Sequence, residues 1–378
     1  MIVAGEASGD MYGARVVEEA HRLDSSVRFF GIGGTAMRRA GVETLVDSKD
    51  MAVVGLFEII SHLGVIARAF KLLKAGILDD KPDLLILIDY PGFNLRLAAV
   101  AKKAGVKVLY YITPQVWAWH SSRAKKIASL VDHAAVILPF EAPFFEREGL
   151  PVTFVGHPLL EMAVPSMSKA AAQNEFGLDS KRRTIGLFPG SRIKEIKLLL
   201  PDMIKAAELL KERFSDLQFL LPLASSVDRE LVDEKIAGTG VEITVVAGKN
   251  YDVMQCCDAI IAASGTVTME IALFGVPMVI VYRTSPFTFA IGSRLVKVDH
   301  VGICNIVAGE RIVPELLQND AEPLKIADEL SRMLVDSQYA EGIRRKLRRV
   351  RSLLGDSGAS ERVARLAIDI MEQGTAKQ

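Results

Sequence analysis

The sequence predicts an α/β protein built from two doubly wound domains, each a parallel sheet with helices on both faces. Short apolar runs alternate with longer amphipathic stretches along most of the 378 residues, and many of the runs end in turns of small residues. A chain of this length also exceeds the size at which one hydrophobic core usually stops growing. We expect the loops that follow the strands of the two domains to face each other across a cleft.

The composition excludes several classes of function. Half of the residues are apolar, and lysine plus arginine equal aspartate plus glutamate at 46 each, so no overall field attracts nucleic acid. The three cysteines match no disulfide framework or metal motif, and the six histidines contain no H-x-x-x-H pair. We therefore expect no metal site and no cofactor.

No apolar run approaches the ~20 residues that span a bilayer, and no signal-peptide pattern is present, so we expect a cytoplasmic protein. The stretch 51–80 has apolar residues at spacings of three and four, with Arg68, Lys71 and Lys74 on one side. Such a basic amphipathic helix either lies on an anionic membrane or packs on a sheet with its charges in solvent. The candidate acyl contacts in it are Leu56, Phe57, Leu63, Ile66 and Phe70.

Polar residues follow three predicted strands in the first half of the chain. Ser8 and Gly9 lie with Glu6 in the small-residue loop after the strand 2–4. Asp89 directly follows the apolar run Leu84–Ile88, where ligands bind in open α/β sheets, with Asn94 shortly after it. The alternative role for Asp89 is to cap its own loop through backbone amides.

The strand 108–111 leads into a loop that contains Gln115 and both tryptophans of the protein, Trp117 and Trp119. Core packing would not concentrate both tryptophans in one loop after a strand. The loop therefore indicates contact with an apolar group or a sugar ring.

Two turns in the second half predict anion sites. In Ala259–Pro277 an apolar strand ends at Ser264, Gly265 and Thr266, and the helix that follows carries Glu270 in its first turn. Free amides at such a helix start bind phosphate groups. The alternative is that Ser264 or Thr266 only caps the helix, with Glu270 complementing its dipole.

The second turn follows the strand 184–188 and consists of Pro189, Gly190, Ser191 and Arg192 before another helix. Its guanidinium group adds a permanent charge to the helix start, which strengthens the phosphate prediction. Between 159 and 183 the alternation of strand and helix breaks, so the domain boundary is expected there. We place the domains at 1–165 and 166–345, followed by a helical segment, 346–378, that is able to return to the first domain.

Seven motifs distributed over nearly the whole chain resemble those of the lipid-A-disaccharide synthase family, glycosyltransferases of the two-domain GT-B type with Rossmann-like domains. The motifs are V-A-G-E-A-S-G-D (3–10), I-D-Y-P-G-F-N (88–94), T-P-Q-V-W-A-W (113–119), F-V-G-H-P (154–158), L-F-P-G-S-R (187–192), A-S-G-T-V-T-M-E (263–270) and N-I-V-A-G-E-R (305–311). The resemblance implies transfer of 2,3-diacylglucosamine from a UDP donor to 2,3-diacylglucosamine 1-phosphate, giving a β-1,6 disaccharide 1-phosphate and UDP. It also implies peripheral contact with the cytoplasmic face of the inner membrane of a Gram-negative bacterium.

The resemblance suggests roles for the candidate residues. The first domain would bind the acceptor and supply the base of an inverting transfer, with Asp89 the first candidate and Glu6 the second. Gly190–Arg192, Ser264–Thr266 and Glu270 would bind the donor nucleotide without a metal, since no D-x-D motif is evident. Asn305 would position a substrate in the company of Ser8, Gly9, Asn94, Gln115, Trp117 and Trp119.

This sequence departs from the family pattern at two positions. Gly92 stands where a second acid often lies, which leaves Asp89 as the acid of its motif, and His120 stands where an arginine often follows the second tryptophan. Two alternative functions are a UDP-N-acetylglucosamine 2-epimerase-like isomerase and a non-catalytic UDP-sugar or lipid-binding protein. The tryptophan pair and the amphipathic segment fit the epimerase poorly, because its substrate is water-soluble.

Overall fold

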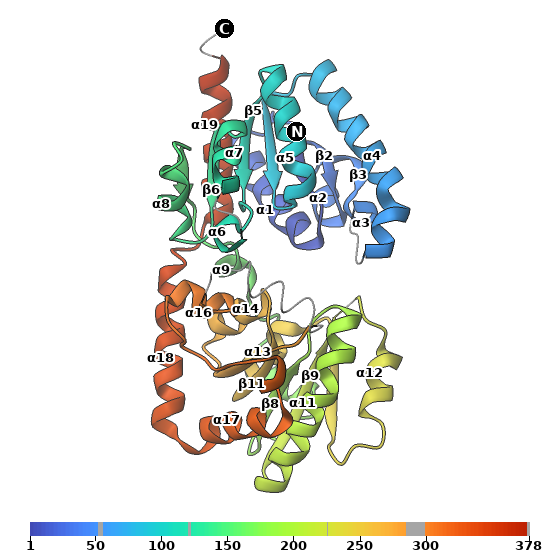
Figure 1. Cartoon of the computed structure of the whole chain (residues 1–378), viewed down its shortest axis with the longest axis vertical. Helices are drawn as coiled ribbons and strands as arrows, with labels where there is room; N and C mark the ends of the chain where they lie inside the picture. The colour runs from blue at the N-terminus through green and yellow to red at the C-terminus, as the bar shows by residue number, and fades with distance from the viewer. Residues whose placement is uncertain (52–55, 120–121, 225, 285–298, 376–378) are drawn as a thin grey trace. The chain divides into compact units, whose positions relative to one another are not determined.

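The computed structural model describes residues 1–51, 56–119, 122–224, 226–284 and 299–375, and the chain divides into two compact units (Figure 1). Unit 1 comprises Met1–Glu161 and Leu354–Gln378, and unit 2 comprises Met162–Leu353. The first boundary therefore lies a few residues before the one that we placed at 165/166. Unit 2 extends to Leu353 because one continuous helix ends there.

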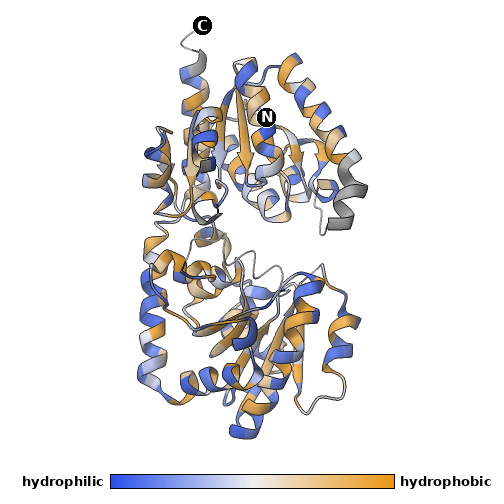
Figure 2. Ribbon diagram, viewed as in Figure 1, coloured by the Kyte–Doolittle hydropathy of each residue, from blue (hydrophilic) through white to orange (hydrophobic). Residues whose placement is uncertain are grey.

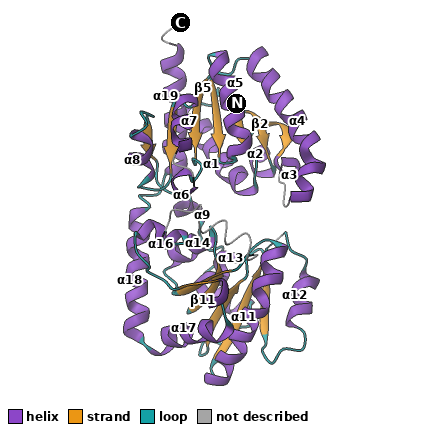
Figure 3. Ribbon diagram, viewed as in Figure 1, coloured by secondary structure: helices purple, strands orange, loops and turns teal. Residues whose placement is uncertain are grey.

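Unit 1 contains a seven-stranded parallel sheet of order β3-β2-β1-β4-β5-β6-β7, covered by helices (Figure 3). Its strands are β1 (Ile2–Ala4), β2 (Phe30–Gly33), β3 (Glu43–Asp47), β4 (Leu84–Ile88), β5 (Lys107–Tyr111), β6 (His133–Val136) and β7 (Val152–Phe154). Its helices are α1 (Ala7–Leu23), α2 (Thr35–Arg39), α3 (Ser48–Met51), α4 (Leu56–Asp79), α5 (Pro91–Ala104), α6 (Val116–Trp119), α7 (Ser122–Leu130), α8 (Glu141–Glu146) and α19 (Ala359–Thr375), and α9 (Leu159–Met162) crosses the boundary.

Unit 2 contains a six-stranded parallel sheet of order β10-β9-β8-β11-β12-β13. Its strands are β8 (Arg183–Phe188), β9 (Leu217–Leu223), β10 (Ile243–Ala247), β11 (Ala259–Ala263), β12 (Met278–Tyr282) and β13 (Glu315–Leu317). Its helices are α10 (Lys169–Glu175), α11 (Ile193–Arg213), α12 (Arg229–Ile236), α13 (Asn250–Cys256), α14 (Val267–Phe274), α16 (Ile303–Ala308), the 3₁₀ turn η1 (Gln318–Asp320), α17 (Pro323–Val335) and α18 (Ser337–Leu353).

The central strands are apolar throughout because helices cover both of their faces. All five residues of β4 are buried, and alternate side chains enter the two core clusters of unit 1: Leu85 and Leu87 join one, and Leu84, Ile86 and Ile88 the other. In Figure 2 the strands are correspondingly orange, whereas the surface helices have both blue and orange residues. The prediction of two doubly wound, Rossmann-like domains is confirmed.

The last helix, α19, packs against α1 and against β4 and β5 in unit 1. Val363, Ala364 and Ala367 lie on its buried face and complete the second core cluster. Glu161 anchors its start, because Oε1 accepts hydrogen bonds from the amides of Gly358 at 2.8 Å and Ser360 at 3.3 Å. The expected return of the C-terminal helix to the first domain is thus observed.

The sequence analysis missed β3 and β13, which are edge strands. β3 has the mixed sequence E-T-L-V-D and no fully buried residue, and β13 is only three residues long. Edge strands lack the continuous apolar runs that identify central parallel strands, so their sequences carry little signal.

Asp10 connects α1 to the loop after β2. Its carboxylate is 7% exposed and accepts hydrogen bonds from the amides of Gly34 at 2.6 Å, Ala36 at 3.0 Å and Met37 at 3.0 Å. A Cβ atom at Gly34 would lie 2.6 Å from the same carboxylate, so this position requires glycine.

We expect Asp10→Ala to lower the free energy of unfolding by about 2–4 kcal/mol, because three amides lose a charged acceptor. Urea unfolding followed by far-UV circular dichroism measures the loss. The control, Asp24→Ala, removes an exposed carboxylate beyond the end of the same helix and should lower the free energy of unfolding much less. Equal losses in the two variants would contradict this role of Asp10.

Candidate functional site

In each sheet the strand order reverses between two adjacent central strands, β1 and β4 in unit 1 and β8 and β11 in unit 2. The pairs end together, since Ala4 lies opposite Ile88 and Ala262 opposite Phe188. Chains leave such a pair toward opposite faces of the sheet, which opens a crevice where ligands bind. All four loops with the principal predicted residues follow these four strands.

The backbone after β4 is strained. Asp89 and Tyr90 both have left-handed dihedrals, with φ of 45° and 47°, although neither is glycine. Each such residue costs on the order of 1–3 kcal/mol and persists only where surrounding contacts hold it.

Those contacts come from both sides of the turn. Asn94 Nδ2 donates to the carbonyl of Asp89 at 2.7 Å and to that of Ile88 at 3.2 Å, and the Tyr110 hydroxyl donates to Asp89 O at 2.7 Å. The Tyr90 hydroxyl donates to Met51 O at 3.1 Å. The Tyr90 ring also covers Gly5, where a Cβ atom would lie only 2.6 Å from the ring.

The carboxyl group of Asp89 has a pKa raised to about 6. Burial is the main cause and the negative charge of Glu6 the second, while the amide of Tyr90 acts in the opposite direction. Glu6 itself is exposed in the loop after β1. A carboxylate with this pKa is ionised at neutral pH, yet is a better proton acceptor than an ordinary aspartate. The hydrogen bond from the Tyr90 amide agrees with the alternative that Asp89 caps its own loop. The raised pKa of Asp89 suits a residue that acts as a catalytic base.

Three residues of unit 1 that were predicted to contact a substrate lie in a helix or are buried, and not in an open loop. Helix α1 begins at Ala7, so Ser8 and Gly9 lie in its first turn and not in a loop. Ser8 is half-buried, whereas Gly9 packs on β1, where a Cβ atom would lie 3.3 Å from that of Ala4. Asn94 is fully buried and holds the backbone at Asp89. The Oδ1 atom of Asn94 is buried without a hydrogen-bond partner in the described structure, and contact of Gly9 and Asn94 with a substrate stays a prediction.

The segment after β5 and α4 agree only in part with the predictions. Both tryptophans, expected in a loop, lie in the short helix α6. Gln115 is exposed and Trp117 half-buried, while the side chain of Trp119 lies outside the described residues. Ile66 and Phe70 are half-buried and pack against the core of unit 1, and Phe70 meets Phe93 edge-on at 5.8 Å. Their expected membrane contact stays a prediction. The side chains of Leu56, Phe57 and Leu63 also lie outside the described residues.

In unit 2 the predicted nucleotide-binding residues lie together around one cavity of about 420 Å³. This volume is within the range of small-molecule sites. Its lining includes all seven of them: Gly190, Ser191, Arg192, Ser264, Gly265, Thr266 and Glu270. Sequence reasoning missed Pro222, Ala224, Asn250 and Ile303, although the ends of β9 and β10 pointed to the first three.

The two helix starts at this cavity differ. At α11 the Glu195 carboxylate accepts the amide of Arg192 at 3.3 Å and pairs with its guanidinium at 2.9 Å. At α14 neither Ser264 nor Thr266 forms a side-chain cap, and the amides of Gly265 and Thr266 donate to no described residue. The capping alternative for α14 is therefore wrong, and two amides at this start are available to an anion.

Glu270, in the first turn of α14, has a pKa raised to about 7 by burial. Tyr251, which stacks on Phe274 at 5.9 Å, has its pKa raised by burial and by the charge of Glu270. A half-buried carboxylate beside a polar cavity is suited to accept hydrogen bonds from hydroxyl groups of a ligand.

Asn305 does not reach this cavity. It is fully buried, Nδ2 donates to Val313 O at 3.0 Å and to Glu315 Oε1 at 2.7 Å, and Oδ1 accepts the amides of Ile312 and Val313 at 2.9 and 3.1 Å. Its role is to hold the segment before β13, so the prediction that it positions a substrate directly is corrected.

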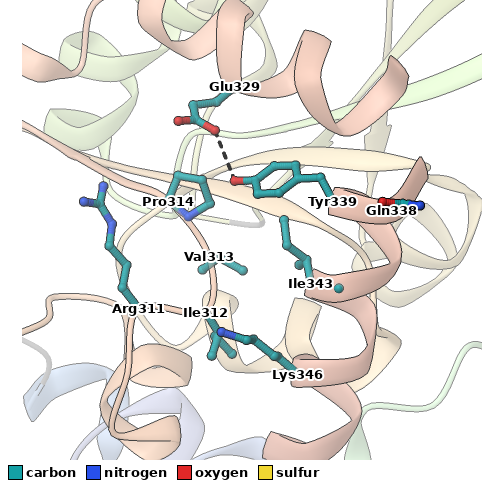
Figure 4. A pocket seen from close by; sticks show the side chains of 10 residues that line it. Arg311, Ile312, Val313, Pro314, Glu329, Gln338, Tyr339, Ile343 and Lys346 are labelled. Carbon is teal, nitrogen blue, oxygen red and sulfur yellow. Dashed lines mark hydrogen bonds between the residues drawn. The ribbon is translucent and has the colours of Figure 1, made fainter. Parts of the chain in front are cut away.

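A second cavity, of about 430 Å³, lies beside α17 and α18 at the amino end of β13, the edge of the sheet opposite the nucleotide loops (Figure 4). Its charged groups bind one another or the backbone. Glu329 accepts the Tyr339 hydroxyl at 3.3 Å, Lys346 pairs with Glu310 at 2.7 Å, and Arg311 donates to Glu315 O at 2.6 Å. This cavity gives no indication of a ligand.

Two Rossmann-like units with polar loops at both switch points, one beside an open helix start, are typical of proteins with the GT-B architecture. Solved structures with this fold include a Neisseria meningitidis UDP-GlcNAc 2-epimerase bound to UDP-GlcNAc (TM-score 0.67, 13% identity, 96% of this chain and 98% of that one). A calicheamicin glycosyltransferase is similar too (TM-score 0.61, 16% identity, 98% and 97%). These likenesses concern the fold alone.

The chain belongs to the lipid-A-disaccharide synthase family, whose model, described as lipid-A-disaccharide synthetase, matches residues 1–367. It is 57% identical to the lipid-A-disaccharide synthase of Geobacter sulfurreducens over 98% of this chain and 97% of the relative. It is 42% identical to that of Coxiella burnetii over 98% of each. It is thus a glycosyltransferase that forms the lipid A disaccharide, and its family implies UDP-sugar and lipid substrates.

The described helices include none long and apolar enough to cross a membrane. Among the described residues, no three histidine, cysteine, aspartate or glutamate side chains lie close enough to hold a metal ion.

The raised pKa of Glu270 predicts a pH-dependent stability. Because the folded chain binds this proton more tightly than the unfolded chain, the contribution is present below about pH 4.5 and is lost as the pH rises through about 7. The free energy of unfolding of Glu270→Gln, measured relative to the wild type, should therefore increase by on the order of 2–3 kcal/mol as the pH rises from 4.5 to 8. Urea unfolding at both pH values measures the difference.

The control is Glu234→Gln, since that side chain is 71% exposed and should give the same difference at both pH values. If the stability difference between Glu270→Gln and the wild type does not vary with pH, burial does not raise the pKa of Glu270.

Proposed function

We propose that the chain transfers 2,3-diacylglucosamine from UDP to the 6-hydroxyl of 2,3-diacylglucosamine 1-phosphate by one inverting displacement. The products are the β-1,6 disaccharide 1-phosphate and UDP. In this proposal unit 2 binds the donor, and unit 1 binds the acceptor and supplies the base. The observation that carries it is the cavity of unit 2, around which all seven predicted nucleotide residues lie in a member of this family.

The donor would bind with its diphosphate at the free amides of Gly265 and Thr266 and the positive end of the α14 dipole. Arg192 adds charge, because its exposed ion pair with Glu195 is worth at most about 1 kcal/mol and is readily exchanged for a phosphate. Glu270 would accept hydrogen bonds from the ribose hydroxyls. These groups stabilise the charge that develops on UDP as it leaves.

Asp89 is the proposed base. It would accept the proton of the acceptor 6-hydroxyl while that oxygen bonds to the anomeric carbon and the bond to UDP breaks. The raised pKa of about 6 supports this role. Glu6 is the second candidate, and its charge contributes to that pKa even if it touches no substrate.

Transfer from radiolabelled UDP-diacylglucosamine, assayed in EDTA with and without acceptor, tests the proposal. We expect Asp89→Ala and Asp89→Asn to lower kcat about 10²–10⁴-fold, because each removes the base. Glu6→Gln should lower it less, and calorimetry should show UDP binding unchanged in all three variants.

A kcat of Asp89→Ala within a few-fold of the wild-type value would contradict the role of Asp89 as the base. Loss of transfer in EDTA that magnesium restores would contradict metal-independent departure of UDP. Conversion of the donor without any acceptor would instead favour an epimerase, and binding without conversion would favour a non-catalytic protein.

We also propose that α4 contacts the membrane from which both lipids come. Its outward face has Arg68, Lys71 and Lys74, and two apolar side chains, Leu72 and Leu78, are 44% and 45% exposed on it. Exposed apolar groups among cations favour insertion at an anionic lipid surface.

We expect Leu72→Glu to reduce flotation of the protein with vesicles containing anionic phospholipid. A carboxylate opposes both the insertion of apolar side chains and the attraction of the cations to the anionic lipid. Leu23→Glu, at a 37% exposed leucine on α1, is the control and should float as the wild type does. Undiminished flotation of Leu72→Glu would exclude α4 as the contact.

A further inference from the structure

Glu141 is a buried carboxyl that the sequence analysis did not identify. It begins α8, after the end of β6, and is only 2% exposed. Its Oε1 accepts a hydrogen bond from Trp117 Nε1 at 3.2 Å and lies 3.5 Å from the Thr113 hydroxyl, and its Oε2 accepts the amide of Leu138 at 3.0 Å. The strands β5 and β6 are neighbours in the sheet, and the Glu141 side chain joins the segments that follow them.

The indole of Trp117 is held at two points. Its N–H group is bound by Glu141, and its ring meets Phe140 at 4.9 Å with an interplanar angle of 85°, an edge-to-face contact. A hydrogen bond at one end of the ring and an aromatic contact beside it leave the side chain little freedom to rotate. Because Phe140 and Glu141 are consecutive, both restraints come from the start of α8.

Burial raises the pKa of Glu141 to about 7, opposed by the hydrogen bonds from Leu138, Trp117 and Thr113. A buried carboxyl group is costly unless its donors stay in place. Movement of Trp117 away from Glu141 would remove the indole donor from the Oε1 atom of Glu141, which is buried. The cost of that movement favours a single orientation of the loop.

We propose that Glu141 is a positioning residue for the acceptor lipid, acting by fixing the orientation of Trp117 and thereby of the loop 113–119. The inference rests on the proposed function, which assigns this loop to the acceptor. A loop held in one conformation loses less entropy when the acceptor binds, so Glu141 contributes to acceptor affinity without touching the acceptor.

Steady-state kinetics and tryptophan fluorescence of the full chain test this role. In Glu141→Ala we expect the KM for the acceptor to rise about tenfold, the change expected for loss of one such hydrogen bond. The kcat value and the KM for the donor should stay within about twofold. Glu141→Gln keeps an oxygen for the indole N–H group and should restore most of the acceptor affinity.

Both tryptophans of the sequence lie in this loop, so its fluorescence reports on the proposed restraint directly. In a Trp119→Phe background, the emission of Trp117 should shift to the red in Glu141→Ala and much less in Glu141→Gln. This measurement needs no substrate. It therefore distinguishes failure of the restraint from failure of the proposed function, which wild-type transfer from the UDP donor tests separately.

The control variant is Asp132→Asn. Asp132 holds the opposite end of β5, where its carboxylate accepts the amide of Val108 at 2.9 Å and pairs with Lys102 at 3.2 Å. It should lower stability without changing the acceptor KM or the emission. Equal effects of Asp132→Asn and Glu141→Ala on the acceptor KM would overturn the proposal, because they would indicate a general loss of stability.

A double variant completes the test, with Glu141→Leu, which keeps the buried site filled, used if Glu141→Ala does not fold. If Glu141 acts through Trp117, then Glu141→Ala or Glu141→Leu added to Trp117→Phe should change the acceptor KM no further. Additive effects of the two substitutions would overturn the proposal, and so would an unshifted emission together with an unchanged acceptor KM in Glu141→Ala.

Discussion

The pairing of β1 with β4, and of β8 with β11, is the constraint on which the candidate sites depend. In each unit the chain builds one half of the sheet outward from the first of these strands and then returns to build the other half. Right-handed crossovers then place the helices of the two halves on opposite faces of the sheet. The loops after the paired strands diverge, and that divergence leaves the first amides of α14 and the carboxyl of Asp89 at the ends of buried strands.

The turn after β4 shows what holding a carboxyl there requires. Two consecutive left-handed residues, Asp89 and Tyr90, oppose folding by on the order of 1–3 kcal/mol each. Three hydrogen bonds to the carbonyls of Ile88 and Asp89, together with the contact of the Tyr90 ring with Gly5, offset that strain. Asn94 holds this backbone through its two donated hydrogen bonds, which accounts for a polar side chain that is fully buried.

Desolvation is the first cause of the raised pKa at Asp89, Glu141 and Glu270, yet their surroundings differ. Asp89 faces the negative charge of Glu6, which further favours its protonated form. Glu141 accepts from the indole and backbone groups of two loops. Glu270 lines a cavity. The same burial therefore suits one carboxyl to accept a proton, another to restrain an aromatic ring and the third to bind hydroxyl groups.

The sequence by itself determined the central strands, the two-domain class and the loops that carry chemistry. Apolar runs such as Leu84–Ile88 and turns such as Ser264–Thr266 are local patterns that depend on burial and backbone freedom alone. Tertiary structure decided which side chains those patterns expose: it buried Gly9, Asn94 and Asn305, turned Ile66 and Phe70 inward, and brought Glu141 to Trp117. Local sequence cannot encode such outcomes, because they depend on the strand order and on partners distant in the chain.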